Sequence, residues 1–159
     1  MTLLTKLLQT DKTPEQVAQI LLETLPAYDN ALKDLETKIE IKGKKLEHAN
    51  RENPGYQQYY DERRVELSVV VKWFEIQIER VRGKLFKKFT ENYNRELSDR
   101  AKEQYINNEP AYLMWYEMYL EVKELHDKYD SAKEAFKSRG YALNNITRIR
   151  VASLEDIYV

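Results

Sequence analysis

Five cationic side chains lie within nine residues near the centre of the chain, with no acidic residue among them: Arg80, Arg82, Lys84, Lys87 and Lys88. On a helix that turns about 100° per residue, all but Arg82 share one face, while Val81, Leu85 and Phe89 share another. Lysine and arginine neutralise phosphates, and aromatic rings stack on bases, so the pattern is typical of sequence-independent binding to single-stranded nucleic acid. The alternatives are a solvated helix face or a partner for an acidic patch on a neighbouring subunit.

A second basic stretch follows near the C-terminus. It contains Lys137, Arg139, Arg148 and Arg150, with no acidic residue until Glu155. We expect Arg139 to make a secondary contact with nucleic acid. The twelve tyrosines are spread widely along the chain, and Tyr56, Tyr59 and Tyr60 lie beside acidic residues, so we interpret these three as helix-packing or interface residues.

The sequence contains few residues that are suited to catalysis or metal binding. There is no cysteine, and the two histidines, His48 and His126, lie far apart in charged helical contexts. The four glycines are too widely spaced to form a phosphate-binding loop. The acidic residues alternate with lysine and arginine, as on a solvated helix face. We therefore expect no enzyme, no cofactor and no metal site.

Composition predicts one modest domain that is mostly helical. Of 159 residues, 33% are charged and 42% apolar, the net charge is −1, and only four Gly and four Pro interrupt the chain. The longest uncharged apolar runs, 67–71 and 111–116, are far shorter than the roughly 20 residues that span a bilayer. No secretory signal is recognisable at the N-terminus. We expect a cytoplasmic protein without a membrane segment.

The elements that must position the basic stretches can be delimited by caps and prolines. Thr13, Pro14 and Gln16 form a helix start with a capping box, and Pro26 is expected to end this first helix. A heptad seam interrupted by one lysine should then run to Asn53-Pro54-Gly55, which should end it; its positions are Leu32, Leu35, Ile39, Lys42, Leu46 and Ala49.

The longest helix is expected from about residue 61 to 93. Its apolar face comprises Leu67, Val70, Phe74, Ile78, Val81, Leu85 and Phe89, and Gly83 is its weak point. Ser98 should cap a short helix that closes at Asn107-Asn108-Glu109, and Pro110 should open the next one.

The cleanest heptad pattern in the chain follows Pro110, and it should end at Arg139 and Gly140, with glycine in the left-handed position after the helix. Its positions are Trp115, Met118, Val122, Leu125, Tyr129, Ala132 and Phe136. A short C-terminal helix would then carry Leu143, Ile146 and Ile149. The predicted fold is all-α, with long amphipathic helices in a hairpin or bundle and a short C-terminal oligomerisation helix. Two apolar stripes favour self-association; packing inside one monomer is an equal alternative.

The segment 136–150 contains Lys137, Ser138, Arg139, Gly140 and Tyr141, followed by Asn145, Ile146 and Arg150. It resembles the C-terminal signature of the UvsY family of bacteriophage recombination mediators, in which the first five residues match the family's turn and the last three match its final helix. Residues 97–110 are similar to the family's short helix and proline break. The resemblance covers roughly residues 65–152. Its central Lys/Arg motif corresponds to Leu85-Phe86-Lys87-Lys88-Phe89, where Lys88 matches the motif's arginine; Thr90 to Tyr93 depart from the family pattern.

This resemblance implies a function in DNA recombination, repair and replication in the cytoplasm of an infected bacterial host. Such a mediator binds single-stranded DNA, contacts the single-strand-binding protein and assists loading of the recombinase. It also implies a ring-like homo-oligomer, for which we predict contacts by Trp115, Met118, Val122, Leu143, Ile146 and Ile149. Residues 1–54 have no counterpart and are expected to be an N-terminal helical extension to a mediator core at 55–159. A helical oligomeric scaffold or adaptor without nucleic-acid binding is the alternative function.

Overall fold

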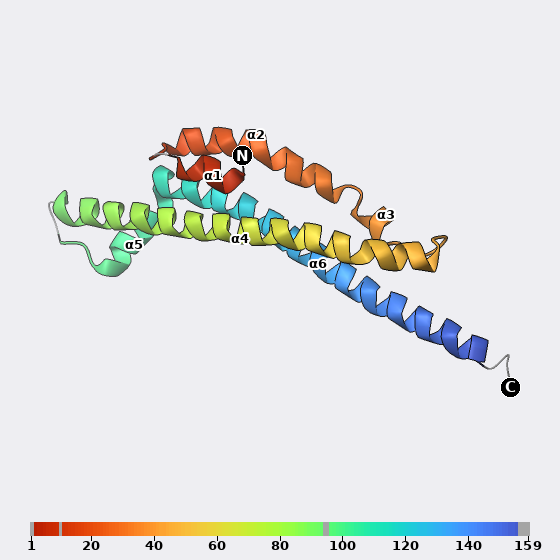
Figure 1. Cartoon of the computed structure of the whole chain (residues 1–159). Helices are drawn as coiled ribbons and strands as arrows, with labels where there is room; N and C mark the ends of the chain where they lie inside the picture. Colours follow the sequence, from red (N-terminus) through yellow and green to blue (C-terminus); the bar gives the residue numbers. More distant parts are fainter. Residues whose placement is uncertain (1, 10, 94–95, 156–159) are drawn as a thin grey trace. The chain divides into compact units, whose positions relative to one another are not determined.

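The computed structural model describes residues 2–9, 11–93 and 96–155, and it is all-α. Within these residues there are six helices and no strand (Figure 1). The helices are α1 (Leu3–Leu8), α2 (Pro14–Leu32), α3 (Leu35–Ile39), α4 (Leu46–Glu91), α5 (Asp99–Asn108) and α6 (Pro110–Glu155). None of the helices in the described ranges is both long and apolar enough to cross a membrane. The prediction of an all-helical protein is confirmed.

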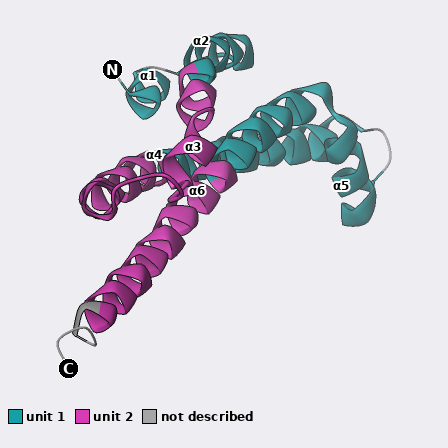
Figure 2. Ribbon diagram, turned by 90° about the vertical axis from the view of Figure 1, so that its right-hand side faces the viewer, with its two compact units in different colours: residues 1–26, 66–126 teal, residues 27–65, 127–159 magenta. Residues whose placement is uncertain are grey.

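Two compact units divide the chain, and each is built from two separate segments. The first comprises Met1–Pro26 and Glu66–His126, and the second Ala27–Val65 and Asp127–Val159 (Figure 2). The chain therefore passes between the units within α2, α4 and α6. The boundary predicted at residue 54 falls inside α4, so the expected N-terminal extension does not coincide with a compact unit.

The first unit is held together by the apolar face predicted for α4. Leu67, Val70 and Phe74 are fully buried there, and the Phe74 ring lies 6.1 Å from that of Trp115 on α6. Helix α1 joins this core through buried Leu3 and Leu7, and the backbone N–H of Leu3 donates to the Glu66 carboxylate at 3.1 Å. Further along α4, Leu85 and Phe89 pack with Ile106 of α5. Here α4 and α6 form the predicted antiparallel hairpin.

The second unit has an aromatic core. The ring of Tyr60 on α4 stacks on that of Phe136 on α6 at 5.2 Å and lies 5.8 Å from that of Tyr129. The buried Tyr129 hydroxyl donates to the Tyr28 carbonyl of α2 at 2.9 Å. Loss of solvent raises the pKa of Tyr129 well above its ordinary value, so the phenol stays neutral in the folded state.

Lysine 38 of α3 sits over the tyrosines that the sequence assigned to packing. Its ammonium lies 5.7, 6.0 and 5.9 Å from the ring centroids of Tyr56, Tyr59 and Tyr60. A cation over aromatic faces is attracted by their negative charge density. These tyrosines therefore join α3 to α4, which confirms their interpretation as helix-packing residues.

The predicted helix starts at residues 13 and 98 are confirmed. The N–H of Thr13 donates to the Gln16 side chain at 3.0 Å, and the N–H of Gln16 donates back to the Thr13 hydroxyl at 3.3 Å. Ser98 caps α5 by accepting from the Ala101 N–H at 3.3 Å, and Pro110 is the first residue of α6. These caps satisfy N–H groups that have no partner within the helix.

The helix ends predicted at Pro26 and Pro54 are wrong. Both prolines lie inside helices, Pro26 in α2 and Pro54 in α4. Each removes one hydrogen bond, to the carbonyl four residues earlier. Leu22 and Asn50 supply those carbonyls, and both residues are on exposed faces where water can serve as the donor. The predicted seam from Leu32 to Ala49 is also wrong, because it is divided among α2, α3 and α4. One break separates α2 from α3, and a turn in which Gly43 has φ +79° separates α3 from α4.

The helix end predicted at Gly140 is wrong as well. Helix α6 continues through this residue to Glu155, so the expected short C-terminal helix is the last part of α6. Gly140 lies inside the helix and packs closely against α4 rather than forming a left-handed turn. A Cβ at position 140 would lie 3.0 Å from Nδ2 of Asn53, which donates to the Phe136 carbonyl at 3.0 Å. Gly140 therefore marks a close contact with α4 and not the end of a helix.

Candidate nucleic-acid interface

Four of the predicted cations form an exposed line on α4, which we call the basic ridge: Arg80, Lys84, Lys87 and Lys88. Leu85 and Phe89, on the opposite side of the helix, are buried in the first unit, so packing fixes the direction of the ridge. Within the described part of the chain, neither Arg80 nor Lys84 forms an ion pair. Lys87 lies 3.8 Å from the Glu91 carboxylate, and the Lys88 ammonium is 5.6 Å from the Phe89 ring centroid.

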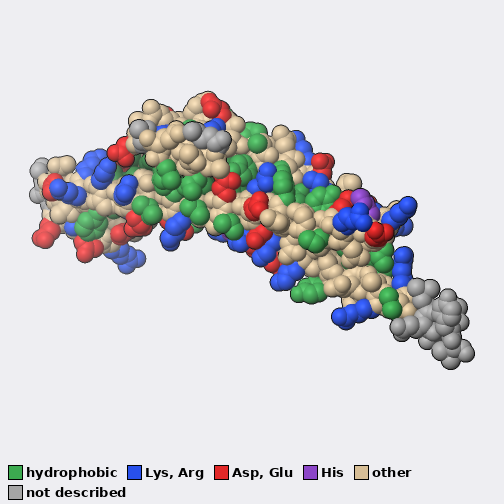
Figure 3. All heavy atoms as spheres, in the orientation of Figure 1, with side chains coloured by type: hydrophobic (Ala, Val, Ile, Leu, Met, Phe, Trp, Pro, Cys, Tyr) green, Lys and Arg blue, Asp and Glu red, His purple; other side chains and the backbone are tan. Residues whose placement is uncertain are grey.

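The surface around the ridge is uneven in charge. On the face shown in Figure 3, lysine and arginine side chains lie over the C-terminal part of α4, and acidic side chains gather nearer α5. Because these cations have few acidic neighbours, the local electrostatic potential is positive and attracts a phosphate backbone.

Arg82 lies outside the ridge, and its guanidinium has partners within the first unit. Its guanidinium forms an ion pair with Glu103 of α5 and donates to the Asn107 side chain at 3.1 Å. It also lies 5.3 Å from the ring centroid of Tyr112 on α6. Arg82 thus ties α5 and α6 to α4. Lys102 of α5 is also buried, and its ammonium lies 4.8 Å from the Phe86 ring centroid on α4.

Arg139 is buried, contrary to the prediction that it contacts nucleic acid. Its side chain is only 3% exposed in the second unit. Nε donates to the Ile39 carbonyl at 3.1 Å, and Nη1 donates to the Ala49 carbonyl and the Asn53 side chain at 3.2 and 2.9 Å. A guanidinium enclosed in this way cannot reach a phosphate. Of the second basic stretch, Lys137, Arg148 and Arg150 remain exposed.

The residues predicted to mediate oligomerisation are mostly used within the chain. Trp115, Met118, Val122 and Leu143 are buried, which supports the alternative of packing inside one monomer for these four. Ile146 is half-buried, and Ile149 is 65% exposed. Only the last turns of α6 therefore keep a predicted contact residue available for another molecule.

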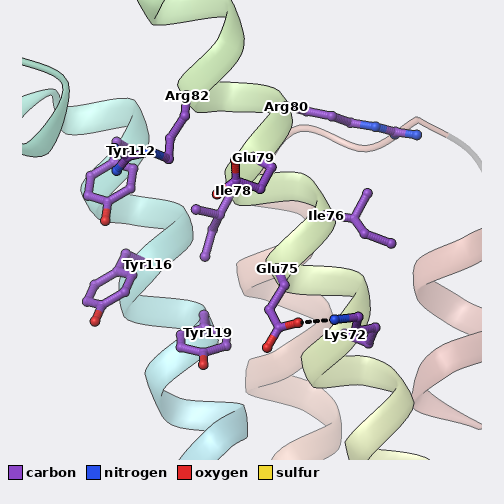
Figure 4. Close-up of a pocket in the computed structure, with 10 residues that line it drawn as sticks. All are labelled: Lys72, Glu75, Ile76, Ile78, Glu79, Arg80, Arg82, Tyr112, Tyr116 and Tyr119. Carbon is purple, nitrogen blue, oxygen red and sulfur yellow. Dashed lines mark hydrogen bonds and ion pairs between the residues drawn. The ribbon is translucent and has the colours of Figure 1, made fainter. Parts of the chain in front are cut away.

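The first unit also contains an open groove of about 950 Å³ beside α4, which the sequence analysis did not anticipate (Figure 4). A row of three tyrosines from α6 forms one wall: Tyr112, Tyr116 and Tyr119. Adjacent rings lie 5.7 and 5.8 Å apart and are inclined by 16° and 27°. Their spacing of four and three residues is the available sequence signal, because it places all three on one helical face.

The opposite wall of the groove comes from α4 and carries both signs of charge. Glu75 accepts from Lys72 at 2.8 Å, and Glu79 and Ile78 lie between that pair and Arg82. Arg80 lines the same groove, with its side chain extending away from the tyrosines (Figure 4). It is therefore shared by the groove and the basic ridge. In the described ranges, no cluster of His, Asp and Glu side chains could hold a metal ion.

Fold and surface together define an all-α protein with an exposed basic ridge and a tyrosine-lined groove on one of its two units. No family model, curated protein or solved structure matches the chain. The functional interpretation therefore depends on the chemistry of these surfaces and on the resemblance noted in the sequence.

Proposed function

We propose that this protein binds single-stranded DNA through the basic ridge and acts as a recombination mediator that assists loading of a recombinase. The observation that carries the proposal is the line of four exposed cations, Arg80, Lys84, Lys87 and Lys88, on a helix face fixed by packing. Flexible lysine and arginine side chains follow a phosphate backbone without reading its sequence, as a mediator that acts on any strand requires.

The near-zero net charge of the chain is compatible with this proposal. A net charge of −1 provides no long-range attraction for DNA, so a single ridge gives weak binding. A ring-like homo-oligomer presents several ridges to one strand, and linked weak sites bind far more tightly than one. The proposed partners are the single-strand-binding protein and the recombinase, in the cytoplasm of an infected bacterial host.

Binding of labelled oligodeoxythymidylate across a salt series tests the site. The test variant combines Lys84→Ala with Lys88→Ala, and the control combines Lys42→Ala with Lys45→Ala, two exposed lysines of the second unit. Both double variants have the same net charge. We expect the test variant to bind more weakly and its salt slope to fall by about 0.7 per lost phosphate contact, while the control matches wild type.

Equal binding by the test variant and wild type would contradict the ridge as the site. A protein that assembles stably but binds no oligonucleotide at low salt would instead support the helical scaffold or adaptor. The mediator step is then measured as recombinase assembly on DNA already covered by single-strand-binding protein. The wild-type protein should accelerate that assembly, and the ridge variant should not.

A further inference from the structure

The tyrosine row offers aromatic surface next to the basic ridge. Tyr116 is 38% exposed, and its ring lies between those of Tyr112 and Tyr119 at the centroid separations of 5.7 and 5.8 Å. At one end of the row, the planar guanidinium of Arg82 lies 5.3 Å from the Tyr112 ring. Ion pairing with Glu103 and a hydrogen bond to Asn107 hold this guanidinium in place. The row is thus a continuous wall of aromatic and delocalised groups.

The groove carries both signs of charge, and its tyrosine wall suits uncharged rings. Glu75 and Glu79 line it together with Lys72, Arg80 and Arg82, and Glu75 is paired with Lys72 at 2.8 Å. A nucleobase is uncharged, and its amino and imino groups can donate to carboxylates and phenolic oxygens. Ile78 adds an apolar side chain facing the tyrosines (Figure 4).

Arg80 connects the groove with the ridge. It lines the groove and also begins the line of exposed cations that continues through Lys84 and Lys88. A single strand carries its phosphates on one side and its bases on the other. The ridge can therefore hold the phosphates of a strand while its bases are directed to the groove.

We propose that the groove between α4 and the tyrosine row of α6 is a base-stacking site for single-stranded DNA, with Tyr116 as the principal stacking residue. The inference rests on the proposed function, because the ridge must first bind the strand. It adds a contribution that salt does not weaken, since stacking releases no counterions. Stacking is also tolerant of sequence, because every base has a π-face.

The test compares oligodeoxythymidylate with an abasic strand of the same length, which keeps the phosphates and lacks the bases. The variants are Tyr116→Leu alone and combined with Tyr119→Leu; leucine keeps an apolar side chain of high helix propensity. Tyr141→Leu is the control, because Tyr141 is 63% exposed on the same helix but does not line the groove. Circular dichroism checks that all variants stay folded.

We expect wild type to prefer the strand with bases, and the groove variants to lose about 10-fold in affinity for it with an unchanged salt slope. On the abasic strand, wild type and all three variants should bind equally. Unchanged affinity of the groove variants for oligodeoxythymidylate would overturn the stacking site, and so would an equal loss on both strands. In either case the proposed function of the ridge is retained if the variant with Lys84→Ala and Lys88→Ala binds more weakly than wild type. Failure of wild type to bind either strand would overturn both proposals.

Discussion

At the scale of single residues, Arg139 shows that a residue predicted from the sequence to bind nucleic acid can instead have a structural role. Its guanidinium is buried without a carboxylate partner in the described chain, and carbonyls of α3 and α4 surround it together with the Asn53 amide. One terminal nitrogen, Nη2, has no hydrogen-bond partner among the residues that the structure describes. Carbonyl oxygens near a helix C-terminus carry partial negative charge, as Ile39 does at the end of α3, and this charge stabilises a buried cation. Arg139 therefore fixes α3 and α4 on α6.

Replacing Arg139 with methionine should destabilise the fold. The variant leaves the buried Asn53 side-chain oxygen without its Arg139 donor, and the half-buried Ile39 carbonyl loses its donor as well. Each unsatisfied buried acceptor is costly, so we expect the free energy of unfolding to fall by about 2–4 kcal/mol. Urea denaturation followed by circular dichroism measures it. Arg148→Met, at an exposed position of the same helix, is the control and should change stability by less than about 0.5 kcal/mol.

At the scale of elements, the sequence predicted capped helix starts and buried faces well and helix ends poorly. It also placed the start of the longest helix at about residue 61, whereas α4 begins at Leu46. Caps such as Thr13 and Ser98 act through contacts within four residues, so they can be read locally. Proline and glycine act through penalties of a few kcal/mol or less, which water at an exposed carbonyl or packing against another helix can offset. Pro54 and Gly140 are such cases, and their partners lie far away in the sequence.

The candidate site was predictable in part for the same reason. Four clustered cations and the apolar face opposite them identify the ridge directly, because they are close in sequence on one helix. The tyrosine row was missed because Tyr112, Tyr116 and Tyr119 are interleaved with the stronger heptad through Trp115 and Met118. The ion pair of Arg82 and the burial of Arg139 could not be predicted because their partners, Glu103 and Asn53, lie 21 and 86 residues away.

Two glycines in helices should respond oppositely to alanine. A Cβ at Gly83 of α4 would meet no atom within 4 Å, whereas a Cβ at Gly140 of α6 would crowd the Asn53 amide at 3.0 Å. We expect Gly83→Ala to raise the free energy of unfolding by about 0.5–1 kcal/mol through helix propensity. Gly140→Ala should lower it, because the amide nitrogen must move from its hydrogen bond to the Phe136 carbonyl. Thermal unfolding of both variants decides this; stabilisation by Gly140→Ala to the same extent would show that the contact is unimportant.

At the scale of the whole molecule, function depends on how many ridges one strand can contact. A chain of net charge −1 gains little from electrostatic attraction, so assembly must supply the affinity that the proposed mediator needs. The four buried residues of the predicted oligomer contact cannot contribute to it in this conformation. Ile149 and Val151 on the last turns of α6 remain exposed and apolar. Assembly through these turns would use residues of the second unit, whereas the ridge belongs to the first.

Ile149→Glu should therefore weaken both assembly and the gain in affinity with strand length. Burying an isoleucine side chain contributes about 1.5–3 kcal/mol, and a carboxylate at the same place must also be desolvated, so subunit association should weaken at least about 10-fold. Asn144→Glu adds the same charge at another exposed position of this segment and is the matched control. Sedimentation over a range of concentrations measures assembly.

Oligonucleotides of increasing length then connect assembly with binding. Wild type and the control should gain steeply in affinity once a strand spans more than one subunit, because the second contact is intramolecular. The Ile149→Glu variant should bind short strands as wild type does, since its ridge is intact, and gain little from longer ones. If its mass and length dependence match those of the control, the last turns of α6 are not the interface. A wild-type protein that sediments as a monomer at every concentration would contradict assembly itself, and high affinity would then have to come from a single ridge and groove.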